Sequence, residues 1–149
     1  MLARFARRAL AVAAFATLST FAFADTSAPT ETKGLKSVVL PSGLEFIDLR
    51  KGTGAEAKPG KMLKVHYTGW LADSKKKFDS SVDRHEPFAF KLGSGMVIRG
   101  WEEGFDGMKV GGRRQLRIPA KLGYGDHGAG DAIPPNADLV FDVALVDVQ

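Results

Sequence analysis

The pattern of apolar and polar positions predicts mostly β structure after residue 38. Runs rich in β-branched and aromatic residues, or with apolar residues two apart, predict strands at 44–49, 62–71, 78–81, 88–92, 112–119 and 139–148. In the last of these segments Phe141, Val143 and Leu145 share one face, because side chains alternate along a strand. Stretches containing Gly and Pro separate the segments, as turns do.

One segment, residues 97–108, follows a different period. Ile98, Trp101, Phe105 and Met108 are three, four and three residues apart, which is the spacing of one apolar helix stripe. Glycines within the segment lower its helix propensity, so we expect a short helix held by packing. Closely spaced strands with one small helix predict an α+β domain dominated by an antiparallel sheet.

The first 24 residues have the layout of an export signal. Three arginines stand ahead of an apolar run, and the run ends in a small-x-small pattern at Ala24. A membrane anchor needs about 20 apolar residues, and Ser19 and Thr20 interrupt this run. The sequence therefore predicts a signal peptide over 1–24 that is cleaved after Ala24. The arginine-rich start is bacterial in style, so we expect a periplasmic or secreted protein.

Removing this segment changes the electrostatic picture. The whole chain carries a formal charge of +4, and three arginines are the only charged residues before residue 25, so the remainder carries +1. A nearly neutral chain argues against a nucleic-acid partner, and the basic residues at 75–77 and 113–117 are interpreted as solvated faces. Residues 25–37 are polar and are predicted to form a flexible linker. The folded domain is expected over 38–149.

The sequence contains few residues in arrangements that support covalent or metal chemistry. The chain has no cysteine, which excludes disulfides, zinc–thiolate sites and a thiol nucleophile. Residues 123–128 fit G-x-G-x-x-G, but Pro134 and Pro135 follow where a dinucleotide fold needs a helix. The three histidines lack metal-ligand spacing, and neither a G-x-S-x-G elbow nor a P-loop occurs. The aromatic residues are either ordinary core or the lining of an apolar cleft, and composition alone leaves both interpretations open.

Several ordered segments decide between these interpretations. The most specific is VIRGWEEG at 97–104. The others, in chain order, are 65–69, 77–81, 87–90, 123–125, 133–137 and 139–143. Across about residues 38–149, the chain resembles the FKBP-type peptidyl-prolyl cis-trans isomerases.

The resemblance implies a fold and a function. The fold is a twisted antiparallel sheet of about five strands wrapped around one short helix. The function is acceleration of X–Pro bond rotation during folding of exported proteins, without a cofactor or a metal. Expected partners are proline-containing polypeptides and macrolide inhibitors of the family, with no nucleic acid and no stable membrane insertion, and the chain is expected to be a monomer. The alternative is a non-catalytic chaperone or peptide-binding module that uses the same cleft.

The resemblance also assigns roles to individual residues. Trp101 would form the floor of the pocket, Asp79 would be an acceptor held by Arg84, and the Ile98 N–H and the Tyr124 hydroxyl would donate to macrolides. The implied catalytic set is Tyr67, Phe78, Asp79, Tyr124 and Phe141, and the implied substrate-binding set is Phe88, Val97, Ile98, Trp101 and Ile133.

Three features depart from the family pattern. The loop at 73–77 is one residue longer than the usual short turn, and Ala129 stands where some relatives carry a histidine. The segment 126–132 is small and rich in glycine. These positions lie at the rim that the resemblance implies, so they bear on substrate preference and activity level and leave the floor intact.

Overall fold

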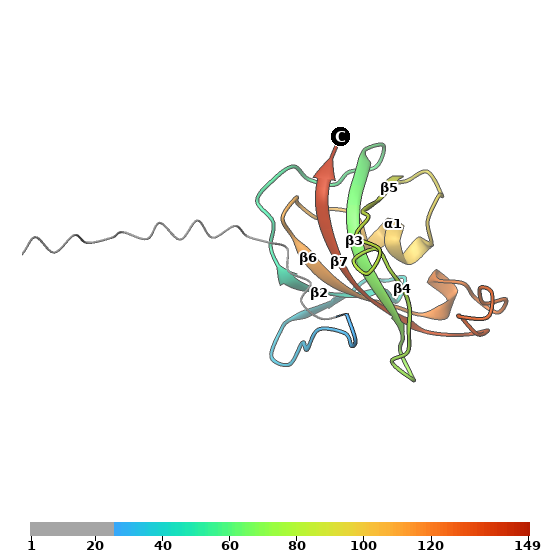
Figure 1. The fold of residues 1–149 in the computed structure, drawn as a ribbon. Coiled ribbons are helices and arrows are strands. Elements are labelled where there is room, and N and C mark those ends of the chain that lie inside the picture. Colours follow the sequence, from blue (N-terminus) through green and yellow to red (C-terminus); the bar gives the residue numbers. More distant parts are fainter. Residues whose placement is uncertain (1–25) are drawn as a thin grey trace, which may run out of the picture.

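The computed structural model describes residues 26–149, and the predicted signal peptide lies outside them. A curved antiparallel sheet wraps one short helix (Figure 1), which confirms the predicted α+β fold. The elements in chain order are β1 (Ser37–Val39), β2 (Glu45–Arg50), β3 (Met62–Leu71), β4 (Lys77–Ser80), β5 (Phe88–Lys91), α1 (Arg99–Phe105), β6 (Arg113–Ile118), the 3-10 helix η1 (Ala120–Leu122) and β7 (Leu139–Val148). Among the described residues no helix is both long and apolar enough to cross a membrane.

The strands do not pair in chain order. They run β1-β2-β6-β7-β3-β4, and β5 also pairs with β3. The two ten-residue strands, β3 and β7, form the centre and pair in a register that sets Gly69 opposite Phe141. The sheet has seven strands where about five were expected, and β1 is the strand that the sequence pattern did not single out. This topology places residues from distant segments around one end of α1 (Figure 1).

The main core lies between the sheet and α1, and two helix glycines set the spacing there. A Cβ on Gly100 would lie 2.6 Å from Ile118 Cγ2, and one on Gly104 would lie 2.6 Å from Leu116 Cδ1. Both glycines are buried, and their lack of a side chain lets α1 approach β6 closely. The glycines that lower helix propensity therefore serve packing.

The helix is shorter than predicted. It covers Arg99–Phe105 rather than 97–108, because Ile98 is extended at φ −58° and ψ 151° and Asp106 ends the helix at ψ 124°. Met108 lies beyond the helix in a turn, yet it is buried at 3 % exposure, as the apolar stripe predicts.

The polar segment predicted as a flexible linker lies against the sheet instead. The backbone N–H and the hydroxyl of Thr30 donate to Asp142 Oδ2 at 2.8 and 2.6 Å, and Gln115 Nε2 donates to the Thr30 carbonyl at 2.9 Å. Asp142 and Gln115 alternate with the core residues Phe141 and Leu116, so they face the side of the sheet away from α1. We call residues 26–32 the N-terminal strap. Polar contacts hold it, and apolar periodicity cannot reveal such contacts.

Candidate active site

A pocket of about 370 Å³ opens between the start of α1 and the inner face of the sheet. It is lined by Tyr67, Phe78, Asp79, Phe88, Met96, Val97, Ile98, Trp101, Tyr124 and Phe141. All but one of the residues assigned to the site by resemblance are therefore brought together. Because β3, β4, β5, β7 and the start of α1 each contribute, the pocket forms only in the folded domain.

The floor of the pocket is the indole of Trp101 in α1. Its ring lies 4.8 Å from that of Tyr67 at 72° and 5.4 Å from that of Phe141 at 82°, both edge-on arrangements. Such edge-to-face pairs are favoured and fix the orientation of the rings. Within the described part of the chain, Trp101 Nε1 is buried with no hydrogen-bond partner, which costs about 1–3 kcal/mol. The floor is thus a packed aromatic surface whose ring orientations are fixed.

One wall depends on a glycine. A Cβ on Gly69 would lie 2.6 Å from Phe141 Cε1 and 2.6 Å from Phe78 Cζ. The absence of that atom lets the Phe78 and Phe141 rings meet at 5.4 Å and 86° above β3. Any larger residue at this position would separate the two rings.

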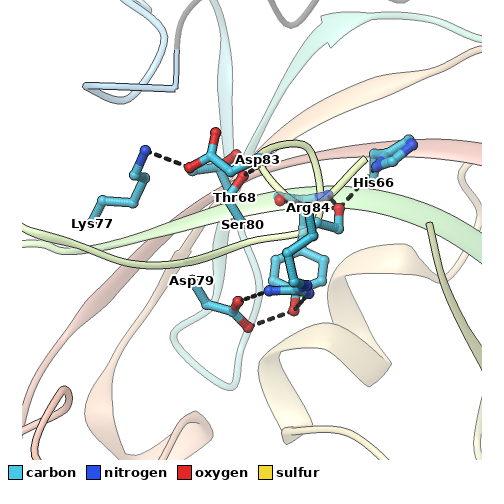
Figure 2. A network of polar contacts seen from close by, with 9 residues as sticks. His66, Thr68, Lys77, Asp79, Ser80, Asp83 and Arg84 are labelled. Atoms are coloured by element: carbon cyan, nitrogen blue, oxygen red, sulfur yellow. Dashed lines mark hydrogen bonds and ion pairs between the residues drawn. The ribbon is translucent and has the colours of Figure 1, made fainter. Parts of the chain in front are cut away.

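The polar edge of the pocket is a triad of side chains. The Tyr67 hydroxyl donates to Asp79 Oδ2 at 2.5 Å, while Arg84 Nη1 donates to Asp79 Oδ1 and Arg84 Nη2 donates to the Tyr67 hydroxyl at 3.0 Å. Figure 2 shows the guanidinium of Arg84 facing the carboxylate of Asp79. The contact between Asp79 and Arg84 that the resemblance implies is therefore present. It leaves one carboxylate held from two sides at the mouth of an apolar pocket.

This environment raises the pKa of both phenols. Burial raises the pKa of Tyr67 above 10.0, and its bond to Asp79 adds to that shift. Burial also raises the pKa of Tyr124 above 10.0, with a smaller contribution from the nearby Asp79 charge. The bonds to Tyr67 and Asp79 raise the pKa of Arg84 further above its ordinary value. At neutral pH both tyrosines therefore keep a proton that they can donate.

The rim carries a residue that sequence reasoning missed. Met96 lines the pocket with 63 % of its surface exposed, in the turn before α1. The carboxylate of Glu102 holds this turn, because Glu102 Oε2 accepts from the Gly93 N–H and Glu102 Oε1 accepts from the Gly95 N–H at 3.1 Å. Met96 directly precedes the most specific motif, at 97–104, and this position in the sequence is the signal that could have identified it as a pocket residue.

One predicted site residue lies elsewhere. Ile133 does not line the pocket and is buried in the core at 5 % exposure. Its backbone forms a pair of hydrogen bonds with Ala129, at 2.9 and 3.1 Å, which folds the glycine-rich loop back on itself. The loop thereby turns the isoleucine inward. Between residues 26 and 149, no group of three or more His, Asp or Glu side chains is placed to hold a metal ion.

The chain is similar to known proteins in sequence and in fold. Residues 54–146 match the family described as FKBP-type peptidyl-prolyl cis-trans isomerase. An FK506-binding protein of Neisseria meningitidis serogroup B is 57% identical over 106 residues, which are 71% of this chain and 96% of that relative. The peptidyl-prolyl cis-trans isomerase FPR2 of Saccharomyces cerevisiae is 56% identical over 94 residues, covering 63% of this chain and 70% of the relative.

Solved structures agree with the sequence relatives. AtFKBP13 superposes with a TM-score of 0.71 at 42% identity, covering 76% of this chain and 99% of that one. FkpA from Escherichia coli gives a TM-score of 0.70 at 42% identity, covering 76% of this chain and 51% of that one, so this chain spans about half of FkpA. The chain belongs to the FKBP-type peptidyl-prolyl cis-trans isomerase family and is a peptidyl-prolyl isomerase.

Proposed function

We propose that the aromatic pocket accelerates X–Pro rotation by binding the proline ring on Trp101 and favouring the twisted amide. The observation that carries this proposal is the ring geometry: Tyr67 and Phe141 stand edge-on around a buried indole. A twisted amide has lost conjugation and is less polar than a planar one. A dry apolar site therefore disfavours the planar form relative to the twisted form.

The energy required is within reach of such a site. Rotation about a peptide bond has a barrier of about 18–20 kcal/mol, and uncatalysed X–Pro rotation takes tens to hundreds of seconds. Reaching a typical turnover near 10 per second requires roughly a thousandfold acceleration, or about 4 kcal/mol. No covalent bond is made or broken, so the reaction needs neither a nucleophile nor a metal.

The polar edge supplies orientation in this scheme. Tyr67, Phe78, Asp79, Tyr124 and Phe141 surround the twisting amide, while Phe88, Val97, Ile98 and Trp101 hold the proline side. The Tyr124 hydroxyl is free to approach a substrate carbonyl from the mouth of the pocket, where the residue is 39 % exposed. Its raised pKa keeps it a donor. A fixed donor adds to transition-state stabilisation without reorganising during the reaction.

We also propose that macrolides of the FK506 type occupy this pocket, as the names of the relatives indicate for those proteins. Titration of the chain with FK506 should shift the Trp101 indole N–H resonance and abolish isomerisation of a proline peptide with the same midpoint. Inhibition without a Trp101 shift would place the macrolide elsewhere.

The cellular role we propose is folding of exported proteins by a monomer in the periplasm. The predicted signal peptide supports export, and a nearly neutral chain suits contact with apolar proline segments rather than polyanions. N-terminal sequencing of the exported protein should begin at Asp25, and a start at Met1 would contradict export by cleavage. Sedimentation of the exported chain should give one species at the monomer mass.

A further inference from the structure

The outer face of the sheet buries an aromatic residue that the main core does not include. Trp70 is 1 % exposed, but along β3 it alternates with the inward-facing Leu71, so its indole faces away from α1. Trp70 Nε1 donates to the Thr26 carbonyl at 3.2 Å. The first residue of the N-terminal strap is thus fixed beside a buried indole on the outer face.

The side chain of Thr26 makes a second set of contacts. Its hydroxyl donates to Asp83 Oδ1 at 2.7 Å and accepts from Lys77 Nζ at 3.0 Å. Lys77 Nζ also donates to Asp83 Oδ2 at 2.5 Å, a contact drawn in Figure 2. The two bonds, from Lys77 and then from Thr26, lower the pKa of Asp83. The Asp83 carboxylate therefore joins the N-terminal strap to β4 and to the turn that follows β4.

That carboxylate is one residue away from the polar edge of the pocket. Asp83 is exposed in the turn at 81–85, and the next residue, Arg84, bonds to both Asp79 and the Tyr67 hydroxyl. Figure 2 shows Lys77 reaching the carboxylate of Asp83, and the guanidinium of Arg84 facing the carboxylate of Asp79.

Inner contacts hold the base of the same turn. The Asp83 backbone N–H donates to Ser80 Oγ at 3.2 Å, and the Glu86 N–H donates to the Ser81 carbonyl at 3.1 Å. The His85 N–H also donates to the Val82 carbonyl at 3.0 Å. On the outer side of the turn, the Asp83 side chain contacts Thr26 and Lys77, and these contacts tie that side to the strap and β4. An exposed turn with few contacts moves unless such bonds restrain it.

We infer that Thr26 and Asp83 are positioning residues for isomerisation, because the strap holds the turn that presents Arg84 to Asp79 and Tyr67. This inference rests on the proposed role of the pocket. Neither residue lines the pocket. They act by limiting the positions that the Arg84 guanidinium takes at the pocket edge, and so by keeping Asp79 and Tyr67 in one arrangement.

The test uses matched threonine variants of the full chain. Thr26→Val removes the hydroxyl that contacts Asp83, and Thr26→Ser restores it. The control is Thr32→Val at the other end of the strap, where Thr32 Oγ1 accepts from Arg117 Nη2 at 2.8 Å. Loss of one positioning bond should lower kcat/KM for a proline peptide by about fivefold in Thr26→Val. Thr26→Ser should restore it, and Thr32→Val should leave it unchanged. Asp83→Asn, which keeps the shape of the side chain, should resemble Thr26→Val.

Of the two tryptophans of the chain, Trp70 provides the spectroscopic signal that separates a positioning role from an effect on stability. Thr26→Val should shift the Trp70 indole N–H resonance, which reports the strap, together with the Arg84 side-chain N–H resonances. An unchanged kcat/KM with a shifted Trp70 resonance would overturn the inference, as would equal losses in Thr26→Val and Thr32→Val. Asp79→Ala separates the two proposals. If it lowers kcat/KM and Thr26→Val does not, the positioning role alone fails. If neither variant lowers it, the proposed role of the pocket fails as well.

Discussion

The Tyr67 hydroxyl lies 2.5 Å from Asp79 Oδ2, and the same hydroxyl accepts from Arg84 Nη2 at 3.0 Å. A phenol on β3 and a carboxylate on β4 are thus joined across the strand pair that forms one wall of the pocket. The guanidinium of Arg84 closes the triad by also bonding Asp79. This geometry makes Asp79 the group whose removal disturbs the largest part of the polar edge.

We predict that Asp79→Ala lowers kcat/KM for a proline peptide by about tenfold, which corresponds to about 1.4 kcal/mol in the transition state. The reason is that Tyr67 and Arg84 lose their common acceptor and adopt other orientations. Stability should fall by only about 1 kcal/mol, because the Asp79 side chain is 39 % exposed. Peptide isomerisation and urea unfolding measure the two effects. Asp147→Ala, at the far end of β7, is the control and should leave kcat/KM unchanged.

The aromatic wall can be tested with little loss of stability. Phe88 is 37 % exposed and its ring lies 6.1 Å from that of Trp101. We predict that Phe88→Ala raises KM and lowers kcat/KM by about tenfold, because the proline ring loses one apolar contact surface. Met62→Ala removes a side chain that is 42 % exposed outside the pocket, and it should change neither constant. Equal effects of the two variants would contradict a specific wall.

Much of the fold follows from periodicity, and the limits have physical causes. Phe141, Val143 and Leu145 form one buried face of β7 as their alternation predicts. The strand order does not follow from it, because β3 pairs with β7 across a long stretch of chain. Alternation also cannot reveal the contact of Thr30 with Asp142, because polar groups make it.

The site was predictable from motifs more than from chemistry. Trp101 and Phe141 meet as the family resemblance implies, while the aromatic composition alone left core and cleft equally open. Ile133 does not line the pocket as the resemblance implies, because backbone hydrogen bonds with Ala129 fold the glycine-rich loop and turn this side chain into the core. Met96 was missed because its side chain is exposed and belongs to no motif, although it directly precedes the motif at 97–104. The geometry of the turn brings it to the rim.

Both tyrosines of the chain lie at the pocket, so their titration reports the site directly. Their pKa values are raised above 10.0, and tyrosinate absorbance in the folded chain should therefore have its midpoint above pH 10. A raised pKa means that the folded state favours the protonated phenol. The associated stability is complete below pH 10 and is lost as pH rises through the folded-state values. A folded-state midpoint at or below pH 10, or stability that rises across this range, would contradict the burial described for these phenols.

The close approach at Gly69 gives a steric prediction. Gly69→Ala places a Cβ where only 2.6 Å separates it from Phe78 and Phe141. Overpacking of this kind costs about 1–3 kcal/mol, and the two rings must move apart. We predict a lower unfolding midpoint and altered ring-current shifts for both phenylalanines, with kcat/KM reduced more than in Phe88→Ala. Wild-type ring shifts in the variant would show that the wall tolerates the added atom.

The most direct measurement follows a proline peptide bound at the pocket and its rate of cis–trans exchange together. The peptide should shift the Trp101 indole N–H resonance, and exchange of the bound peptide should reach about 10 per second, roughly a thousandfold above the uncatalysed rate. Binding that shifts Trp101 while exchange stays at tens to hundreds of seconds would contradict catalysis by this pocket and would identify it as a peptide-binding module.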